Sequence, residues 1–195
     1  MTKNKKALII FARKPELGKV KTRLAATIGD KKALEIYKKL LAHTKDIVRP
    51  LDCDKFVFLT QQTEDNFWNN FYKELQDGIN LGDKMANAFD TIFSKGYNDV
   101  IIIGTDCPKI STEIVSSAFE KLRKTDVVIG PAEDGGYYLL GIKKIDRELF
   151  ENKEWSSENV LNESLHSIEE LNLSYALLPK LNDVDHERDV PNHWL

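Results

Sequence analysis

The chain has 195 residues, of which 42% are hydrophobic and 30% charged, and its formal net charge at pH 7 is -3. This composition is typical of a globular protein and excludes a disordered chain, and the length suits one domain. The acidic surplus disfavours a nucleic-acid partner, because proteins that bind nucleic acids usually carry excess basic charge. We therefore expect a single domain over residues 1–195, with any positive site confined to one segment.

The apolar runs and the spacing of the cysteines indicate in which cellular compartment the protein is expected. The longest apolar run near the N-terminus, residues 7–12, is too short to span a membrane and is followed by no cleavage pattern. Cys53 and Cys107 are far apart, and neither has a second Cys or His at metal-ligand spacing. We expect a cytoplasmic protein that has no disulfide or zinc site and does not contact membranes.

The first third of the chain predicts two strands and two helices. Residues 7–12 form a continuous apolar run, which favours a central strand covered on both faces. A long helix follows, with Asp30 as its expected N-cap and Pro50 as its stop. Residues 56–59 predict a second strand, and the aromatic residues within 67–75 predict a helix face that packs in the core.

The rest of the chain continues the alternation of helices and strands. The predicted elements are a helix from 85 that Gly96 ends, a strand at 100–103, a helix at 111–124, strands at 127–129 and 137–142, a helix at 156–171 and a strand at 175–178. This order predicts an α/β protein, a three-layer α/β/α sandwich with a mostly parallel sheet. Such sheets bind ligands beyond the carboxyl ends of their strands, so function is expected in the loops there.

A basic segment, residues 13–23, follows the first strand and carries five cations and one anion. A helix N-terminus, a flexible glycine and several cations together favour phosphate binding. The predicted nucleotide- and phosphate-binding residues are Arg13, Lys14, Gly18, Lys19, Lys21 and Arg23. A solvated basic loop is the alternative. The segment matches neither the phosphate loop of kinases and GTPases nor the dinucleotide fingerprint of dehydrogenases, which disfavours those classes.

Two acidic segments follow later strands. Asp106 lies at the end of an apolar strand, where we expect it to hold Mg²⁺ or Mn²⁺ on a diphosphate and so to act in catalysis. An Asp that caps the next turn is the alternative. In the segment 182–186, alternate Asp side chains point to the same side. Asp185 is the preferred second metal ligand, and Asp183 is the alternative.

The loop 130–138 joins two predicted strands and carries the third set of polar groups. Asp134 is the expected catalytic base or acceptor-binding carboxylate. Gly135 and Gly136 allow a substrate to approach the backbone closely, although a tight turn alone also explains them. Tyr137 or its neighbour Tyr138 is expected to stack on a substrate ring, while the other faces the core.

Together these segments resemble a family of bacterial GT-A-like transferases, the glycosyltransferases of the arsenosugar-biosynthesis type. More distantly they resemble the 2-phospho-lactate and molybdenum-cofactor guanylyltransferases. The resemblance covers nearly the whole chain and rests on residues 11–15, 18, 21–25, 81–85, 104–108, 130–138 and 183–185. It implies a nucleotide-diphospho-sugar transferase (GT-A-like) fold, a divalent metal at Asp106 and a substrate loop at 134–137.

The chain departs from the family pattern at two places. Ser156 and Ser157 follow Trp155, where the family usually continues with Gly-Thr, and His186 stands where a Thr is common. Both changes lie on the expected acceptor side, so they bear on the acceptor more than on the nucleotide.

The resulting hypothesis is transfer of a glycosyl group from a nucleotide-diphosphate sugar to a small-molecule acceptor. Nucleotidyl transfer from a nucleoside triphosphate to a phosphorylated small molecule, with release of pyrophosphate, is the alternative. A third class, a nucleotide-binding regulatory module, would need the basic segment but not the metal carboxylates. The base, the sugar, the acceptor and the oligomeric state are left open.

Overall fold

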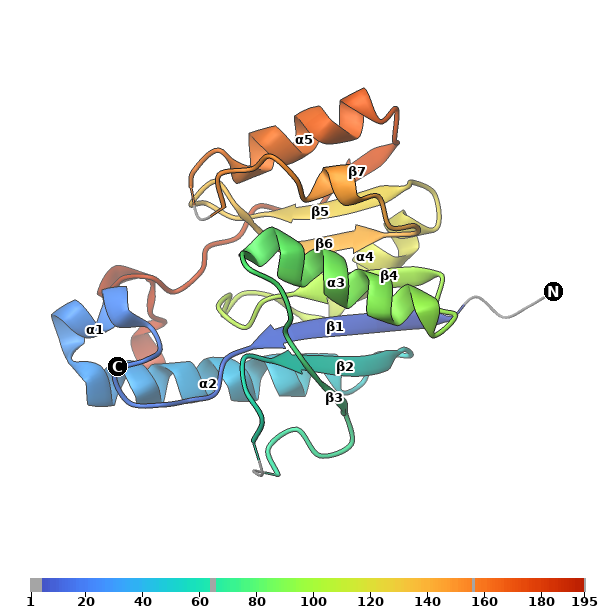
Figure 1. Cartoon of the computed structure of the whole chain (residues 1–195). Helices are drawn as coiled ribbons and strands as arrows, with labels where there is room; N and C mark the ends of the chain where they lie inside the picture. The colour runs from blue at the N-terminus through green and yellow to red at the C-terminus, as the bar shows by residue number, and fades with distance from the viewer. Residues whose placement is uncertain (1–4, 64–65, 156, 195) are drawn as a thin grey trace.

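The computed structural model describes residues 5–63, 66–155 and 157–194, and Figure 1 shows a central sheet covered by helices on both faces. The strands are β1 (Lys6–Ala12), β2 (Asp54–Leu59), β3 (Tyr72–Leu75), β4 (Asp99–Ile103), β5 (Val127–Pro131), β6 (Tyr137–Ile142) and β7 (Tyr175–Leu177). The helices are α1 (Thr22–Ile28), α2 (Asp30–Val48), α3 (Leu81–Ser94), α4 (Thr112–Leu122) and α5 (Val160–Glu170), with short 3₁₀ turns at Arg147–Leu149, Glu187–Asp189 and Asn192–Trp194.

The seven strands form one sheet in the order β3-β2-β1-β4-β6-β5-β7. The pairs β1–β2, β1–β4, β2–β3 and β5–β7 are parallel, whereas β6 runs antiparallel to both β4 and β5. The carboxyl ends of β1, β4, β5 and β7 therefore meet at one edge of the sheet, where β6 begins. This mixed, mostly parallel sheet between two helical layers confirms the predicted fold class.

Alternate residues of the central strands pack into two separate cores. Leu8 and Ile10 of β1 lie in the core formed with α1, α2 and α4, and Ala7 and Ile9 lie in the core formed with α3 and α5. All five residues of β4 are buried, and the four after Asp99 are apolar. Side chains of a strand alternate between its faces, so a strand covered on both faces must be apolar throughout. The continuous apolar runs of the sequence follow from this requirement.

The prediction that Asp30 caps the long helix is wrong. Gly29 is the N-cap, at φ +83°, and Asp30 is the first residue of α2. Gly29 also ends α1, so a glycine with a positive φ lets the chain turn between two helices. Asp30 still lies in the first turn, where its negative charge interacts favourably with the positive end of the helix dipole.

The prediction of a helix at 67–75 is also wrong. Turns occupy residues 66–70, with Asn70 at φ +74°, and residues 72–75 form the edge strand β3. Pairing of β3 with β2 and stacking of Tyr72 on Phe56, with ring centroids 4.8 Å apart, override the helical spacing. Trp68 packs in the core as expected, but Tyr72 is 58% exposed.

The remaining predicted elements are present, with boundaries shifted by a few residues. The helix predicted at 156–171 begins later, at Val160, and Ser156 lies outside the described residues. Asn80 and Asp83 form a capping box that fixes the start of α3. No helix in the described part of the chain is both long and apolar enough to cross a membrane.

Candidate functional site

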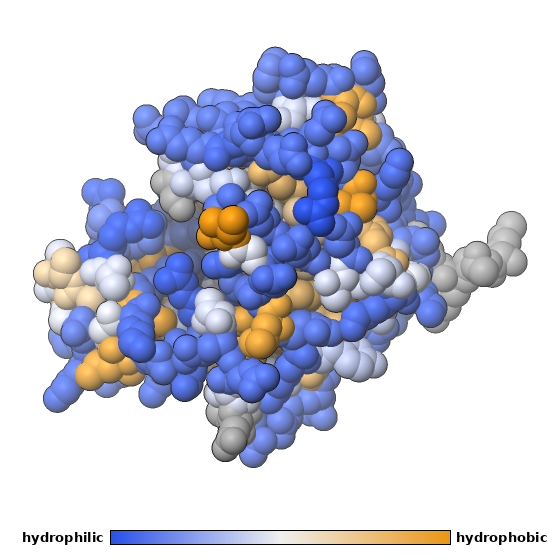
Figure 2. Space-filling view, viewed as in Figure 1, coloured by the Kyte–Doolittle hydropathy of each residue, from blue (hydrophilic) through white to orange (hydrophobic). Residues whose placement is uncertain are grey.

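The predicted functional segments meet at the carboxyl edge of the sheet. The Val184 amide donates to the Asp106 carbonyl (2.9 Å), and the Glu133 amide donates to the Leu181 carbonyl (2.9 Å). These bonds join the segment after β7 to the loops that follow β4 and β5. Figure 2 shows that the surface at this edge is recessed between the α1 side and the side of α3 and α5. The loops therefore form one site.

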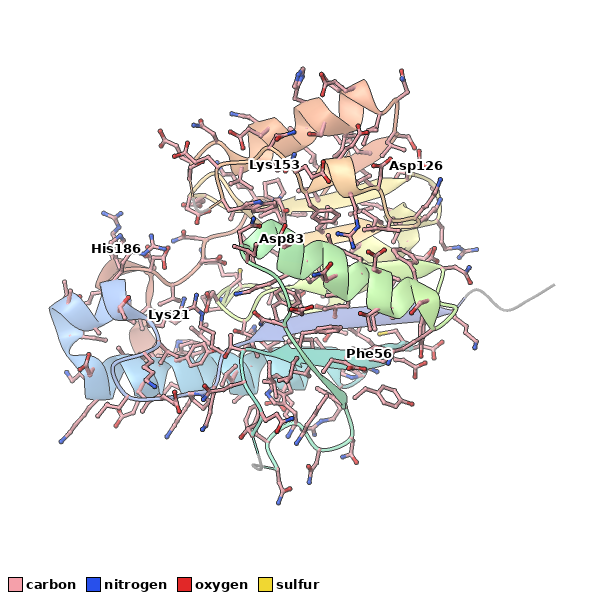
Figure 3. The ribbon with its side chains drawn as sticks, in the orientation of Figure 1. Lys21, Phe56, Asp83, Asp126, Lys153 and His186 are labelled. Atoms are coloured by element: carbon pink, nitrogen blue, oxygen red, sulfur yellow. The ribbon has the colours of Figure 1, made fainter. Side chains whose placement is uncertain are left out.

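Lys21 and Asp106 form the central ion pair of this site. The Lys21 Nζ lies 2.8 Å from the Asp106 Oδ1, and the Lys21 side chain is only 6% exposed. Lys21 is the N-cap of α1 and adopts the left-handed conformation, at φ 49° and ψ 45°, which costs a residue with a Cβ about 1–2 kcal/mol. Asp106 keeps an exposed face, at 46%. Figure 3 shows Lys21 at the start of α1, on the side of the molecule toward which β1 runs.

Asp183 is the most perturbed carboxyl group of the site. Burial, and then the negative charge of Asp106, raise its pKa to about 7, although Lys21 acts in the opposite direction. Its Oδ1 is buried and has no hydrogen-bond partner among the described residues. A buried carboxylate oxygen without a hydrogen-bond partner is energetically unfavourable unless a bound ligand interacts with it.

Asp185, the preferred ligand in the sequence analysis, is instead engaged by a cation. Its Oδ2 lies 3.2 Å from the Arg23 Nη2. Asp189 braces the same segment, because it accepts hydrogen bonds from the amides of Asp185 (3.2 Å) and His186 (2.7 Å) and from the Asn182 side chain (2.9 Å). Burial acts to raise the pKa of Asp189, but these three hydrogen bonds to its carboxylate outweigh burial and lower the pKa.

The acidic groups suit a divalent cation held jointly with a substrate. Among residues 5–63, 66–155 and 157–194, no group of three or more His, Cys, Asp or Glu side chains could hold a metal ion alone. Asp106, with an exposed face, and Asp183, with a partnerless oxygen, could each offer an oxygen to Mg²⁺ or Mn²⁺. Magnesium sites commonly take one or two carboxylates and complete the shell with water and phosphate oxygens.

Four of the five cations of the basic segment divide into two groups. Lys21 and Arg23 contact the acidic cluster. The Lys14 Nζ lies 3.2 Å from one carboxylate oxygen of Glu16 and the Lys19 Nζ lies 3.2 Å from the other, and the two lysines lower the pKa of Glu16. The structure therefore brings only the first group into contact with the acidic residues of the site.

A buried tyrosine fixes the start of the basic segment. The Tyr37 hydroxyl accepts from the Arg13 amide (2.8 Å) and donates to the Arg13 carbonyl (3.1 Å). Burial raises the pKa of Tyr37 to about 12, so the hydroxyl stays protonated and can donate. Gly18, at φ +72°, turns the segment beside Asp30. The Arg13 side chain itself is exposed.

The loop between β5 and β6 presents Asp134 at the surface. The Asp134 Oδ1 accepts from the Gly136 amide (3.0 Å), which orients the carboxylate within its own turn. Gly135 has φ +88°, and a Cβ there would overlap the Glu158 carbonyl. The Gly135 carbonyl also accepts from the Leu161 amide (2.9 Å). Gly135 is thus explained by close packing against the segment before α5.

The two tyrosines that begin β6 point to opposite faces of the sheet. The Tyr138 hydroxyl donates to the Pro179 carbonyl (2.9 Å), and its ring packs over Gly130. The Tyr137 hydroxyl lies 4.0 Å from the Met85 sulfur, and its burial raises its pKa. Only the partly exposed ring of Tyr137 can contact a substrate, while its hydroxyl is held inside.

Three supporting residues were missed by the sequence analysis. Tyr37 fits the apolar spacing of α2, and Asp189 lies in an acidic tail, so neither pattern indicates a role at the site. Trp155 packs on Gly82 so closely that a Cβ at Gly82 would overlap its indole ring. A glycine at the start of α3 could have indicated that a bulky side chain packs against the backbone there. Figure 3 shows Asp83 at that helix end, across the recess from Lys21 and His186.

Cys107 is adjacent to Asp106, but it does not provide a nucleophile. It is buried, and burial raises the pKa of its thiol to about 12. Because the thiolate is the reactive form, this cysteine is inert at neutral pH.

The sheet and its charged edge define the class of protein. A mixed, mostly parallel sheet of this order has the fold of the nucleotide-diphospho-sugar transferases and nucleotidyltransferases. The chain belongs to a bacterial family, described as "Uncharacterized protein conserved in bacteria (DUF2064)", whose sequence pattern matches residues 44–157. No curated protein matches the chain.

Three solved structures are similar to this chain, at different levels of sequence identity. A proposed nucleotide-diphospho-sugar transferase from Desulfovibrio desulfuricans G20 is 30% identical, with a TM-score of 0.88 over 93% of this chain and 82% of that one. The CMP:2-keto-3-deoxy-manno-octonic acid synthetase, solved with CTP, is 10% identical, with a TM-score of 0.59 over 94% of each chain. Rv0371c from Mycobacterium tuberculosis H37Rv, solved with manganese, is 11% identical, with a TM-score of 0.59 over 96% of each chain. The last two are similar to this chain in fold alone.

Proposed function

We propose that the chain is a metal-dependent transferase that transfers a glycosyl group from a nucleotide-diphosphate sugar to a small-molecule acceptor. The observation that carries the proposal is the partnerless oxygen of Asp183 beside Asp106, with Lys21 and Arg23 at the same edge of the sheet. The similarity to the Desulfovibrio protein supports the donor class. We propose that residues 1–195 act as one domain in the cytoplasm, with small molecules rather than nucleic acids or membranes as partners.

Asp106 would hold the divalent cation, together with one carboxylate of the segment after β7. Two observations support Asp183 ahead of Asp185 for this role, because Asp183 has the oxygen without a partner whereas Asp185 is paired with Arg23. When bound, Mg²⁺ or Mn²⁺ would neutralise charge on the departing diphosphate.

The basic segment would bind the phosphates of the donor. Lys21 and Arg23 are the nearest cations to the acidic cluster, and Arg13 is exposed on the loop that begins the segment. Lys14 and Lys19 would join them only by leaving Glu16, and exposed pairs of this kind are weak.

Asp134 would act on the acceptor. In the transfer, the acceptor oxygen forms a bond to the anomeric carbon, the bond to the nucleoside diphosphate breaks, and the acceptor hydroxyl releases one proton. Asp134 is exposed and oriented by Gly136, so it can take that proton. Gly136 and the ring of Tyr137 flank the place where the acceptor would bind.

Nucleotidyl transfer is the second candidate function. The specific observation in its favour is the run Lys21-Thr22-Arg23-Leu24, which resembles the phospho-lactate guanylyltransferases and lies at the ion pair of the site. Against it, the Gly-Gly-rich loop that sugar nucleotidyltransferases usually carry after the first strand is missing.

A product assay separates the two reactions. The protein is incubated with Mn²⁺ and with each nucleotide sugar or nucleoside triphosphate, in the presence of pooled small-molecule acceptors, and the released phosphates are measured. Nucleoside diphosphate from a nucleotide sugar supports glycosyl transfer, and pyrophosphate from a triphosphate supports the alternative. The Asp106→Asn variant is the control for contaminating activity. Absence of both products, together with absence of nucleotide binding by calorimetry, would overturn the proposal.

A further inference from the structure

The burial of Lys21 calls for a physical reason. Lysine is among the residues that are almost never fully buried, because its ammonium loses hydration. Here the side chain is 6% exposed, and the backbone adopts a positive φ that disfavours any residue with a Cβ. Both features are unfavourable alone, so the attraction between the ammonium and the acidic cluster must outweigh them.

The acidic cluster holds more negative charge than Lys21 balances. The charges of Asp106, Asp134 and Asp185 all act on Asp183, and Lys21 is the cation that opposes them there. Arg23 balances only Asp185, and it is mostly exposed. With one ammonium the cluster keeps a carboxylate oxygen without a partner. A cation of higher charge would balance the cluster better than Lys21 does.

We propose that the Lys21 ammonium occupies the place of the divalent ion beside Asp106 in the nucleotide-free protein. When metal and nucleotide bind together, the ammonium moves from Asp106 to the donor phosphates. The inference rests on the proposed metal-dependent transferase function. Lysine suits such an exchange, because it has a flexible four-carbon stem and three N–H groups that can donate to either a carboxylate or a phosphate oxygen. Asp106 is half exposed, so its other face is open to the incoming ion.

This arrangement makes metal and nucleotide binding cooperative. Metal alone must compete with the tethered ammonium for Asp106, whereas a nucleotide gives Lys21 a new partner and frees the carboxylate. Metal and nucleotide therefore strengthen each other's binding by the same factor, as linkage requires. Loss of Lys21 should tighten the binding of metal alone, weaken the binding of nucleotide and reduce the coupling between them.

The test is a titration of the full chain with Mn²⁺ in which free Mn²⁺ is measured by electron paramagnetic resonance. Lys21→Met keeps most of the stem, and Lys21→Gly also relieves the positive φ, so at least one variant should fold, as a thermal melt checks. We expect both to bind Mn²⁺ alone roughly tenfold or more tightly than the parent, within the range typical of coupled sites. Lys109→Met removes an exposed lysine three positions after Asp106 and should change the affinity less than about twofold.

The titration is repeated with saturating UDP, GDP, CDP or ADP. In the parent, at least one diphosphate should tighten Mn²⁺ binding, and this effect should shrink in both Lys21 variants. If the parent shows the effect but neither variant binds Mn²⁺ alone more tightly, the inference is wrong while the proposed function stands. An equal gain in Lys109→Met would also overturn it, because general electrostatics would then explain the change. If no diphosphate affects Mn²⁺ binding by the parent, both the proposed function and the inference that rests on it fail.

Discussion

Replacing Asp183 by Asn should stabilise the metal-free protein at neutral pH. Burial and neighbouring carboxylates raise the pKa of Asp183 from 3.8 to about 7. Between these values the folded protein holds a proton that the unfolded chain releases, so the free energy of unfolding falls as pH rises through this window. Below about pH 4 the group is protonated in both states and has no effect. Above about pH 7 the full destabilisation is present.

The magnitude follows from the size of the shift. About three pKa units at 1.36 kcal/mol each give about 4 kcal/mol as an upper bound. Relaxation and the replacement of one polar group by another reduce this, so we expect a gain of about 1–3 kcal/mol at pH 8 and about none at pH 4.

Urea denaturation in EDTA at pH 4, 5.5 and 8 measures this difference. Asp46→Asn is the matched control, because it loses an exposed ion pair with Arg49 away from Asp183 and should cost about 0–1 kcal/mol without a gain at high pH. A gain for Asp183→Asn that is the same at pH 4 and pH 8, or a loss at pH 8, would refute the reasoning. The comparison uses differences between variants, so the titration of other groups cancels.

Three further predictions follow from the site and its supports. Asp106→Asn should abolish Mg²⁺-dependent nucleotide binding in calorimetry and should lower the melting temperature, because Lys21 loses its charged partner; unchanged binding by the folded variant would remove the proposed metal site. Replacing Lys21 and Arg23 by Ala should weaken nucleotide binding by several-fold to ~100-fold, while binding of the nucleoside stays unchanged; equal affinity for the nucleotide would contradict a phosphate role. Gly135→Ala should cost about 3 kcal/mol or more in urea denaturation, because strain and overlap add, whereas Gly29→Ala, with open space around it, should cost about 1–2 kcal/mol. Equal losses would refute the role of the overlap.

The layers of the fold could be predicted because a strand that is buried on both faces shows a continuous apolar run in the sequence. A strand such as 100–103 must be apolar at every position, and the repeat in α2 marks one buried face. The prediction of a helix at 67–75 was wrong because the aromatic residues of this segment are compatible both with a helical repeat and with a strand at the edge of the sheet. Pairing with β2, a partner set by the tertiary fold, decided between them.

The candidate site could be predicted in its parts but not in its contacts. The position of Asp106 after a buried strand, and of the basic segment after β1, indicated which loops would meet. That Lys21 adopts a positive φ and turns its ammonium inward cannot be predicted from a lysine in a basic run. Likewise, the alternation of Asp183 and Asp185 led us to prefer Asp185 with Asp183 as the alternative, and only the folded chain distinguishes the buried oxygen from the paired one.

The strand order also has a consequence for the speed of folding. The middle of the sheet pairs Ala7 with Val100, residues about ninety positions apart, whereas β5 and β6 form an antiparallel hairpin closed between Pro131 and Tyr137. Closing the long loop costs chain entropy before any pairing compensates for it, and the hairpin has almost no such cost. We expect β5 and β6 to associate early, and the docking of β1 against β4 to limit the rate. The ion pair between the loops that follow those two strands would then form only in the last step.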